Sequence, residues 1–310
     1  MKVRLALFAA SPVYHQAPLY RRFATDPRID FTAIFASDQG AGRPFANDYD
    51  KPVEWGVDPL EGYHSTFLKK AGSNPSGGSV FDLRDPDIVG HVWRGRYDAL
   101  WLHGYHTLTH VLAAAAQKAS GRAVLYREDQ TLLNPRARWK TAVKDVGLRG
   151  FFHGSYGLFV GTENRLWFER WGMPLERLFH APYAVDNDAL RRTARELAPR
   201  RAQVRAELGI DRETGPVILT VGRLIPMKQP LHLLEAFRRV RANQRCTLLV
   251  VGSGQLEHEL RRQVVAHGTH LMSSSRASST KLRSPARMLR PIFSLSSRTT
   301  KRGDWPSTRR

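Results

Sequence analysis

The sequence has 310 residues, 42% of them hydrophobic, which is enough for two domains that each bury a core. The single cysteine, Cys246, excludes an intrachain disulfide, and its place in an apolar run indicates a packing role. No apolar run approaches the roughly 20 residues of a membrane-spanning helix.

The net charge of +20 is unevenly distributed. Residues 269–310 hold ten lysines and arginines against one acidic residue, Asp304, and so contribute +9. Such a charge is typical of proteins that bind nucleic acid or anionic membranes. The arginines of 191–205, however, have no aromatic stacking platform beside them, so we interpret them as solvated and do not favour nucleic acid.

The chain opens with a predicted β-α-β unit. Val3–Ala9 and Ile29–Ala36 are apolar enough for buried strands, and Ala17–Ala24 between them is predicted to be a helix. The loop after the first strand contains His15, which either faces a ligand cleft or is an ordinary surface histidine. The next segment, residues 38–86, is rich in Gly, Pro, Asp and Asn, and we expect it to be irregular and to shape an acceptor site.

Two further strands are expected to end in polar residues. Tyr97–His103 ends in His103, and Ala123–Tyr126 is followed closely by Glu128 and Asp129. The two carboxylates either act at a reacting centre or form a solvated or salt-bridged pair.

The segment Pro135–Phe152 is basic with interleaved aromatic residues. It is either a peripheral membrane contact or an amphipathic helix with a solvated basic face. A strand at Tyr156–Gly161 and a helix at Thr162–Trp171 follow, and Phe179–Asp186 then leads into a linker.

The stretch Val217–Lys228 carries the most informative motif. Its apolar start predicts a buried strand, and Gly222 permits a sharp turn at the end of that strand. Arg223 and Lys228 then place a planar guanidinium and a compact ammonium near the carboxyl end of the strand, which suits a diphosphate. A solvated basic turn is the alternative interpretation.

The segments that follow favour the ligand-binding interpretation. A helix is predicted at Pro230–Ala242, a strand at Cys246–Val251, a G-x-G at 252–254 and a helix at Gln255–His267. This order, together with the G-R-L-x-P-x-K motif at 222–228, resembles the C-terminal domain of retaining GT-B glycosyltransferases of the large family 4 type. The resemblance covers roughly residues 1–268 and is strongest from Val217 to Gly254.

The resemblance implies an α/β fold of the GT-B type, with two Rossmann-like domains of which the second is incomplete. Residues 1–182 would be the acceptor-side domain, 183–215 the linker, 216–268 a partial nucleotide-sugar-binding domain and 269–310 a disordered basic tail. The implied enzyme transfers a sugar from a nucleotide diphosphate-sugar to an acceptor hydroxyl with retention of configuration.

The same resemblance implies roles for particular residues. Gly222, Arg223 and Lys228 would bind the donor, and the last two would stabilise the leaving diphosphate. No metal or cofactor is expected, and the acceptor would be a sugar or a lipid-linked molecule. The strand that ends in His103 looks like the family's strand that ends in a histidine near the cleft, which makes His103 a second candidate cleft residue. Many relatives have a further histidine near residues 127–129, which this chain lacks. We expect a cytoplasmic protein with peripheral membrane contact as an option.

The tail, residues 269–310, has ten serines and no periodic apolar face, which indicates disorder. If its codons are read one base earlier, each new codon joins the last base of one codon to the first two bases of the next. The new codon that spans Asp304 and Trp305 must then encode leucine, and the one that spans Trp305 and Pro306 must encode alanine. Suitable third bases then give three strings that resemble the rest of a family 4 domain, including its E-x7-E signature. We therefore hypothesise the loss of one base near codon 268, which would leave this chain truncated and weakly active or inactive. Stop codons in the shifted frame would refute this.

Two other classes of function were weighed. A basic polyanion-binding or nucleic-acid-binding protein that uses the Arg-rich tail is the alternative. A Rossmann oxidoreductase is disfavoured, because no G-x-G-x-x-G follows the first strand.

Overall fold

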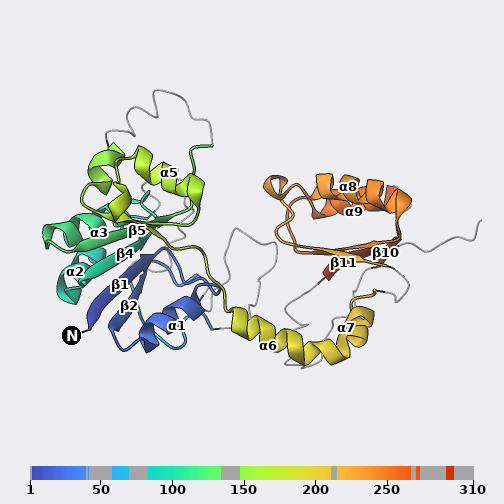
Figure 1. Cartoon of the computed structure of the whole chain (residues 1–310), viewed down its shortest axis with the longest axis horizontal. Coiled ribbons are helices and arrows are strands. Elements are labelled where there is room, and N and C mark those ends of the chain that lie inside the picture. The colour runs from blue at the N-terminus through green and yellow to red at the C-terminus, as the bar shows by residue number, and fades with distance from the viewer. Residues whose placement is uncertain are drawn as a thin grey trace, which may run out of the picture. The chain divides into compact units, whose positions relative to one another are not determined.

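The computed structural model describes residues 2–39, 41, 58–69, 83–133, 147–210, 215–266, 270–272 and 291–296. The chain divides into two compact units. Unit 1 comprises residues 1–45 and 57–186, and unit 2 comprises residues 46–56 and 187–310 (Figure 1). The predicted domain boundaries at 182 and 215 stay predictions.

Unit 1 is built on a seven-stranded parallel sheet in the order β3-β2-β1-β4-β5-β6-β7. The neighbouring strands β1 and β4 are far apart in sequence, which is the strand order of a doubly wound sheet. The strands are β1 (Val3–Ala9), β2 (Ile29–Phe35), β3 (His64–Phe67), β4 (Ala99–His103), β5 (Ala123–Glu128), β6 (Tyr156–Phe159) and β7 (Leu178–His180).

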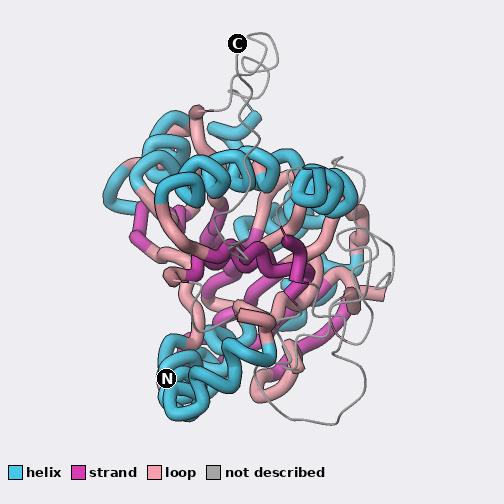
Figure 2. The backbone as a smooth tube through the Cα atoms, turned by 90° about the vertical axis from the view of Figure 1, so that its right-hand side faces the viewer, coloured by secondary structure: helices cyan, strands magenta, loops and turns pink. Residues whose placement is uncertain are grey.

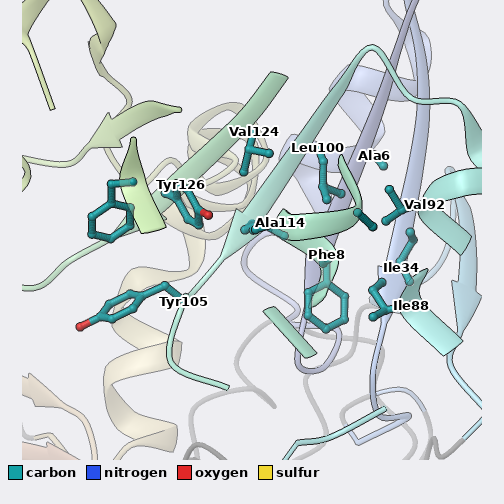
Figure 3. Packing of buried hydrophobic residues seen from close by; sticks show 14 of the residues in the cluster. Ala6, Phe8, Ile34, Ile88, Val92, Leu100, Tyr105, Ala114, Val124 and Tyr126 are labelled. Carbon is teal, nitrogen blue, oxygen red and sulfur yellow. The ribbon is translucent and has the colours of Figure 1, made fainter. Parts of the chain in front are cut away.

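Helices cover both faces of this sheet. The helices of unit 1 include α1 (Ala17–Thr25), α2 (Asp87–Gly95), α3 (Leu108–Ala119), α5 (Thr162–Arg170) and the 3-10 turn η1 (Leu175–Arg177). Residues alternate between the faces along each strand. In β1, Leu7 packs in a cluster with Tyr20 of α1, whereas Phe8 packs in the cluster that contains α2, α3 and α5. Figure 3 shows Phe8, Ile34 and Ile88 lying together in that second cluster.

The sequence predicted most of unit 1 but missed its short elements. Strand β3 lies within residues 38–86, which were expected to be irregular, and α2 begins just beyond them. Strand β3 has four residues and β7 has three, too few to show a period of two in the sequence. Both form because they extend the edges of an existing parallel sheet.

The expected linker, residues 183–215, is helical over much of its length. It contains α6 (Asn187–Leu197), the 3-10 turn η2 (Ala198–Arg200) and α7 (Arg201–Glu207), none of which has a buried residue. This exposure agrees with the interpretation of the arginines at 191–205 as solvated. Figure 2 shows the helical course of the backbone.

Unit 2 is a smaller sheet with helices. It contains β8 (Val217–Val221), the 3-10 turn η3 (Pro226–Lys228), α8 (Pro230–Asn243), β9 (Thr247–Val251) and α9 (Glu257–Ala266). Helices α8 and α9 lie together over one face of the sheet (Figure 1). There Phe237 of α8 and Leu260 of α9 pack against Leu248 and Val250 of β9. Cys246 is buried in the same cluster, as expected.

The prediction that Val217–Val221 is a buried strand was wrong. Strand β8 is at the edge of its sheet, and Ile218, Leu219 and Val221 are 36%, 54% and 61% exposed. Strand β9, which has a neighbour on each side, is buried throughout. The apolar pattern of β8 therefore suits an interior strand, whereas its position in this chain is an open edge of the kind that promotes association.

Two short strands lie within the tail that was expected to be disordered. β10 (His270–Met272) pairs antiparallel with β11 (Pro291–Ser296), which pairs antiparallel with β9. The sheet order is β10-β11-β9-β8. The physical reason for this difference is that β9 has unpaired backbone groups on the side away from β8, which a following segment can satisfy. The remainder of 269–310, and with it the polyanion-binding alternative, lies outside the described residues.

The basic aromatic segment Pro135–Phe152 lies mainly outside the described residues. Its described end, 147–152, is helical, and Phe152 is a core residue at 1% exposure, so this residue does not contact a membrane. No helix in the described part of the chain is both long and apolar enough to cross a bilayer.

Candidate functional site

The loops that follow β8 and β9 in unit 2 are joined through their backbones. Gly222 N–H donates to the Val251 carbonyl at 2.9 Å, and Leu224 N–H donates to the Ser253 carbonyl at 2.8 Å. Leu256 N–H returns a bond to the Leu224 carbonyl at 2.9 Å. Three bonds between backbone groups therefore fix the turn that carries Arg223.

The close approach of these loops explains the G-x-G pattern. A Cβ at Gly252 would lie 1.8 Å from the Gly222 carbonyl oxygen, and one at Gly254 would lie 2.7 Å from the Leu224 carbonyl oxygen. Both glycines also have positive φ, at 145° and 149°. Only glycine satisfies both constraints without displacing the turn.

Lys228 lies near the turn that carries Arg223, at the end of the 3-10 turn η3 that follows it. It ends η3, and Gln229 then adopts a left-handed conformation (φ 50°) before α8 begins at Pro230. Arg223 and Lys228 line one hollow together with Gly222. The other residues lining this hollow are Thr220, Val221, Leu224, Pro230, Leu233, Leu248, Val250, Val251 and Leu260.

This hollow combines two cations with apolar walls at the carboxyl end of parallel strands. A guanidinium offers paired donors to phosphate oxygens, and an ammonium adds a concentrated charge. The amino terminus of the 14-residue helix α8 lies two residues after Lys228 and adds a positive dipole end. The arrangement can therefore stabilise a diphosphate.

A second group of polar residues gathers at the carboxyl end of the sheet in unit 1. His103 of β4 and Arg127 of β5 are direct partners in the strand register. The ring of His103 stacks on Trp101 at 4.8 Å, and its Nε2 is buried. Burial and the positive charge of Arg127 lower the pKa of His103 to about 3.

His15 belongs to the same group. Partial burial lowers its pKa, and the charge of Arg127 lowers it further. The structure therefore brings the two candidate histidines, His15 and His103, within the electric field of one buried arginine. Whether they serve a ligand cleft stays a prediction.

The two carboxylates that follow β5 have different environments. Glu128 is buried at 9% exposure, whereas Asp129 is exposed. The alternative that both carboxylates are solvated therefore holds for Asp129 but not for Glu128.

Sequence reasoning missed Arg127. The predicted strand ended at Tyr126, which placed Arg127 beyond it, but β5 extends two residues further and buries the arginine to 3% exposure. The available signal was an arginine next to a run of strand-forming residues, at the end where α/β sheets bind ligands.

Comparison with known proteins supports the resemblance. Residues 202–276 match the family model described as Glycosyl transferases group 1. No curated protein matches the chain. The matched segment contains β8, the G-R turn, α8, β9 and α9, which are the elements that carry the motif.

Solved structures match over most of the chain. The Anabaena protein Alr3699/HepE in complex with UDP has a TM-score of 0.54 and 15% identity, over 86% of this chain and 66% of that one. A UDP-N-acetylglucosamine 2-epimerase has a TM-score of 0.53 and 13% identity, over 88% and 69%. The UDP-N-acetylglucosamine 2-epimerase from Rickettsia bellii, at 12% identity and a TM-score of 0.45, is matched over 85% of this chain and 65% of its own length.

These likenesses show the fold, which is α/β of the GT-B type. Unit 1 has the parallel, doubly wound sheet of a Rossmann-like domain, whereas the smaller sheet of unit 2 is mixed, with β8 and β9 parallel and the other two pairs antiparallel. The chain spans about two thirds of the length of these structures. The predicted resemblance is confirmed in two respects: residues 202–276 are similar to group 1 glycosyl transferases, and the fold is of the GT-B type. Retention of configuration and the shifted frame stay predictions.

Proposed function

We propose that this chain transfers a sugar from a nucleotide diphosphate-sugar to an acceptor hydroxyl, with retention of configuration. The observation that carries the proposal is the hollow of unit 2, where Arg223 and Lys228 lie together beside Gly222. The family match over residues 202–276 supports it. Retention follows from the resemblance of the motif at 217–254 to retaining enzymes.

In the proposed reaction, negative charge grows on the diphosphate as the bond to the sugar breaks. Arg223 and Lys228 would stabilise this charge more strongly in the transition state than in the bound donor, which is electrostatic catalysis. We propose that these two cations, and not a metal, hold the leaving group. The turn that carries Arg223 is fixed by backbone bonds, so little reorganisation is needed.

We further propose that this chain has low activity. The E-x7-E signature does not occur after Arg223 in the sequence as written, so the glutamates that it supplies to the donor sugar are missing. The hypothesis of a shifted frame after codon 268 predicts that a frame-corrected protein gains this activity. A sugar or lipid-linked acceptor and peripheral membrane contact stay predictions.

Nucleotide binding tests the proposal directly. HepE was solved with UDP and with UDP-glucose, so these are the first ligands to use. Isothermal titration of UDP should give a roughly 10-fold to 100-fold loss of affinity for each of Arg223→Ala and Lys228→Ala, because each removes charge-assisted hydrogen bonds.

The matched control is Arg239→Ala. Arg239 is 80% exposed on α8 and pairs with Glu235 at 3.1 Å, so the variant removes the same charge from the same unit outside the hollow. Its UDP affinity should stay within about twofold of the unmodified chain, as for a surface ion pair. Equal losses in the Arg223 and Arg239 variants would show that only net charge matters. UDP-glucose hydrolysis should be detectable in the frame-corrected protein.

A further inference from the structure

Arg127 in unit 1 is a buried cation whose hydrogen-bonding capacity is only partly used. It is 3% exposed, and two of its three nitrogens, Nε and Nη2, have no hydrogen-bond partner among the described residues. Burial lowers its pKa. An uncompensated buried charge is costly to a fold, and it is retained where a ligand supplies the opposite charge.

Two aromatic rings contact the guanidinium of Arg127. Its central carbon lies 4.4 Å from the Tyr183 ring centroid and 5.6 Å from the Trp101 ring centroid. Such cation-π contacts partly stabilise the charge but take up none of the N–H donors, which an anion can still accept from. Tyr183 is 49% exposed, so a side chain at the surface shields the arginine on one side.

Two histidines lie beside Arg127, and both are neutral near pH 7, because burial and the charge of Arg127 lower the pKa of each. His103 lies beside Arg127 in the strand register, and its Nε2 is buried without a partner. His15 lies within the field of Arg127. Glu128 and Asp129 lie close enough to Tyr183 to raise its pKa. Their charges oppose an anion, so binding depends on direct contact with the guanidinium.

We infer that Arg127, assisted by His103, binds a carboxylate or phosphate group carried by the acceptor. The acceptor would then be an acidic sugar or a sugar phosphate, bound at the carboxyl end of the sheet in unit 1. Naming the bound molecule as the acceptor rests on the proposed function. The binding of the anion itself needs neither the donor nor unit 2.

The test is binding of matched sugars without any nucleotide. Glucuronic acid, glucose 6-phosphate and glucose differ at one carbon, as carboxylate, phosphate and hydroxyl. Saturation-transfer NMR titrations at constant ionic strength should show at least one anionic sugar binding roughly 10-fold or more tightly than glucose. A preference for glucuronic acid identifies a carboxylate, and a preference for glucose 6-phosphate identifies a phosphate.

Variants assign the binding to Arg127. Arg127→Met removes the charge at similar volume and should abolish the preference for the anionic sugar. Arg127→Lys keeps the charge and the fold but loses the paired donors, and it should weaken binding roughly 10-fold. Arg177→Met is the matched control, because Arg177 lies 5.5 Å from the Tyr156 ring centroid, just before β7 begins, at the opposite end of the parallel sheet.

Two results would overturn the inference. One is that neither anionic sugar binds the unmodified chain better than glucose. The other is that the Arg127→Lys and Arg177→Met variants bind the anionic sugar equally well. Failure of the proposed function would appear separately, as loss of UDP binding or of its dependence on Arg223 and Lys228.

Discussion

Two buried histidines should make unit 1 lose stability in mild acid. His110 is 1% exposed, and its Nε2 lies 2.9 Å from the His103 carbonyl oxygen. Its Nδ1 lies 2.6 Å from Thr107 Oγ1. A carbonyl can only accept, so Nε2 carries the proton and Nδ1 accepts from the hydroxyl. The neutral ring is fully satisfied, whereas a second proton would place an uncompensated positive charge inside the core.

Burial lowers the pKa of His103 to about 3 and that of His110 to about 4, from 6.5. Because both folded values lie below the unfolded value, the unfolded chain takes up protons first. Stability is therefore fully present above about pH 6.5 and is lost as the pH falls toward the folded values. Linkage gives about 1.4 kcal/mol for each histidine between pH 7.5 and 5.5, or about 3 kcal/mol together. That is a large fraction of a typical domain stability of about 5–15 kcal/mol.

Urea unfolding at pH 7.5 and pH 5.5, followed by tryptophan fluorescence, measures this loss. Five of the seven tryptophans, at positions 93, 101, 139, 167 and 171, belong to unit 1. Most carboxylates titrate below pH 5.5, so they contribute little in this range. His110→Gln removes one titrating group and should reduce the pH-dependent loss by about half.

The control is His64→Gln, which removes an exposed histidine of β3 and should leave the pH-dependent loss unchanged. The reasoning would be refuted if the unmodified chain were equally stable at both pH values. It would also fail if His110→Gln and His64→Gln had the same effect.

Two further outcomes are expected in unit 2. Gly252→Ala should lower its free energy of unfolding by roughly 3 kcal/mol or more, because the new Cβ would lie 1.8 Å from the Gly222 carbonyl oxygen at a φ of 145°. Gly222→Ala, whose Cβ would meet nothing within 4 Å, should cost less than about 1 kcal/mol by urea unfolding. Leu219→Glu should reduce self-association in light scattering, since Leu219 is 54% exposed on edge strand β8. An unchanged particle size would show that this edge does not drive association.

The sequence was sufficient for the elements that have a strong local pattern. Val3–Ala9 was predicted with the bounds that β1 has, and the helix predicted from Pro230 differs from α8 by one residue at its end. Each combines a clear apolar period with a turn or proline at its boundary. The short strands β3 and β7 lack both features. They form because each pairs with a neighbouring strand at an edge of the sheet, which a local sequence pattern does not show.

The site was predicted less evenly. Arg223 and Lys228 line one hollow because they lie only five positions apart along the chain, and their role in binding a donor stays a prediction. The burial of Arg127 could not be read from the sequence, since it depends on Trp101 and Tyr183, which lie 26 and 56 positions away along the chain. The exposure of β8 was missed because an apolar strand does not reveal how many neighbours it has.

The backbone bonds between the two loops of unit 2 have a practical consequence for protein engineering. Because no side chain of residues 222–224 takes part in them, position 223 can carry other side chains while the turn keeps its course. A series with lysine, glutamine and glutamate at this position would vary charge and reach on an unchanged frame. Differences in ligand preference within the series would then report on the side chain alone.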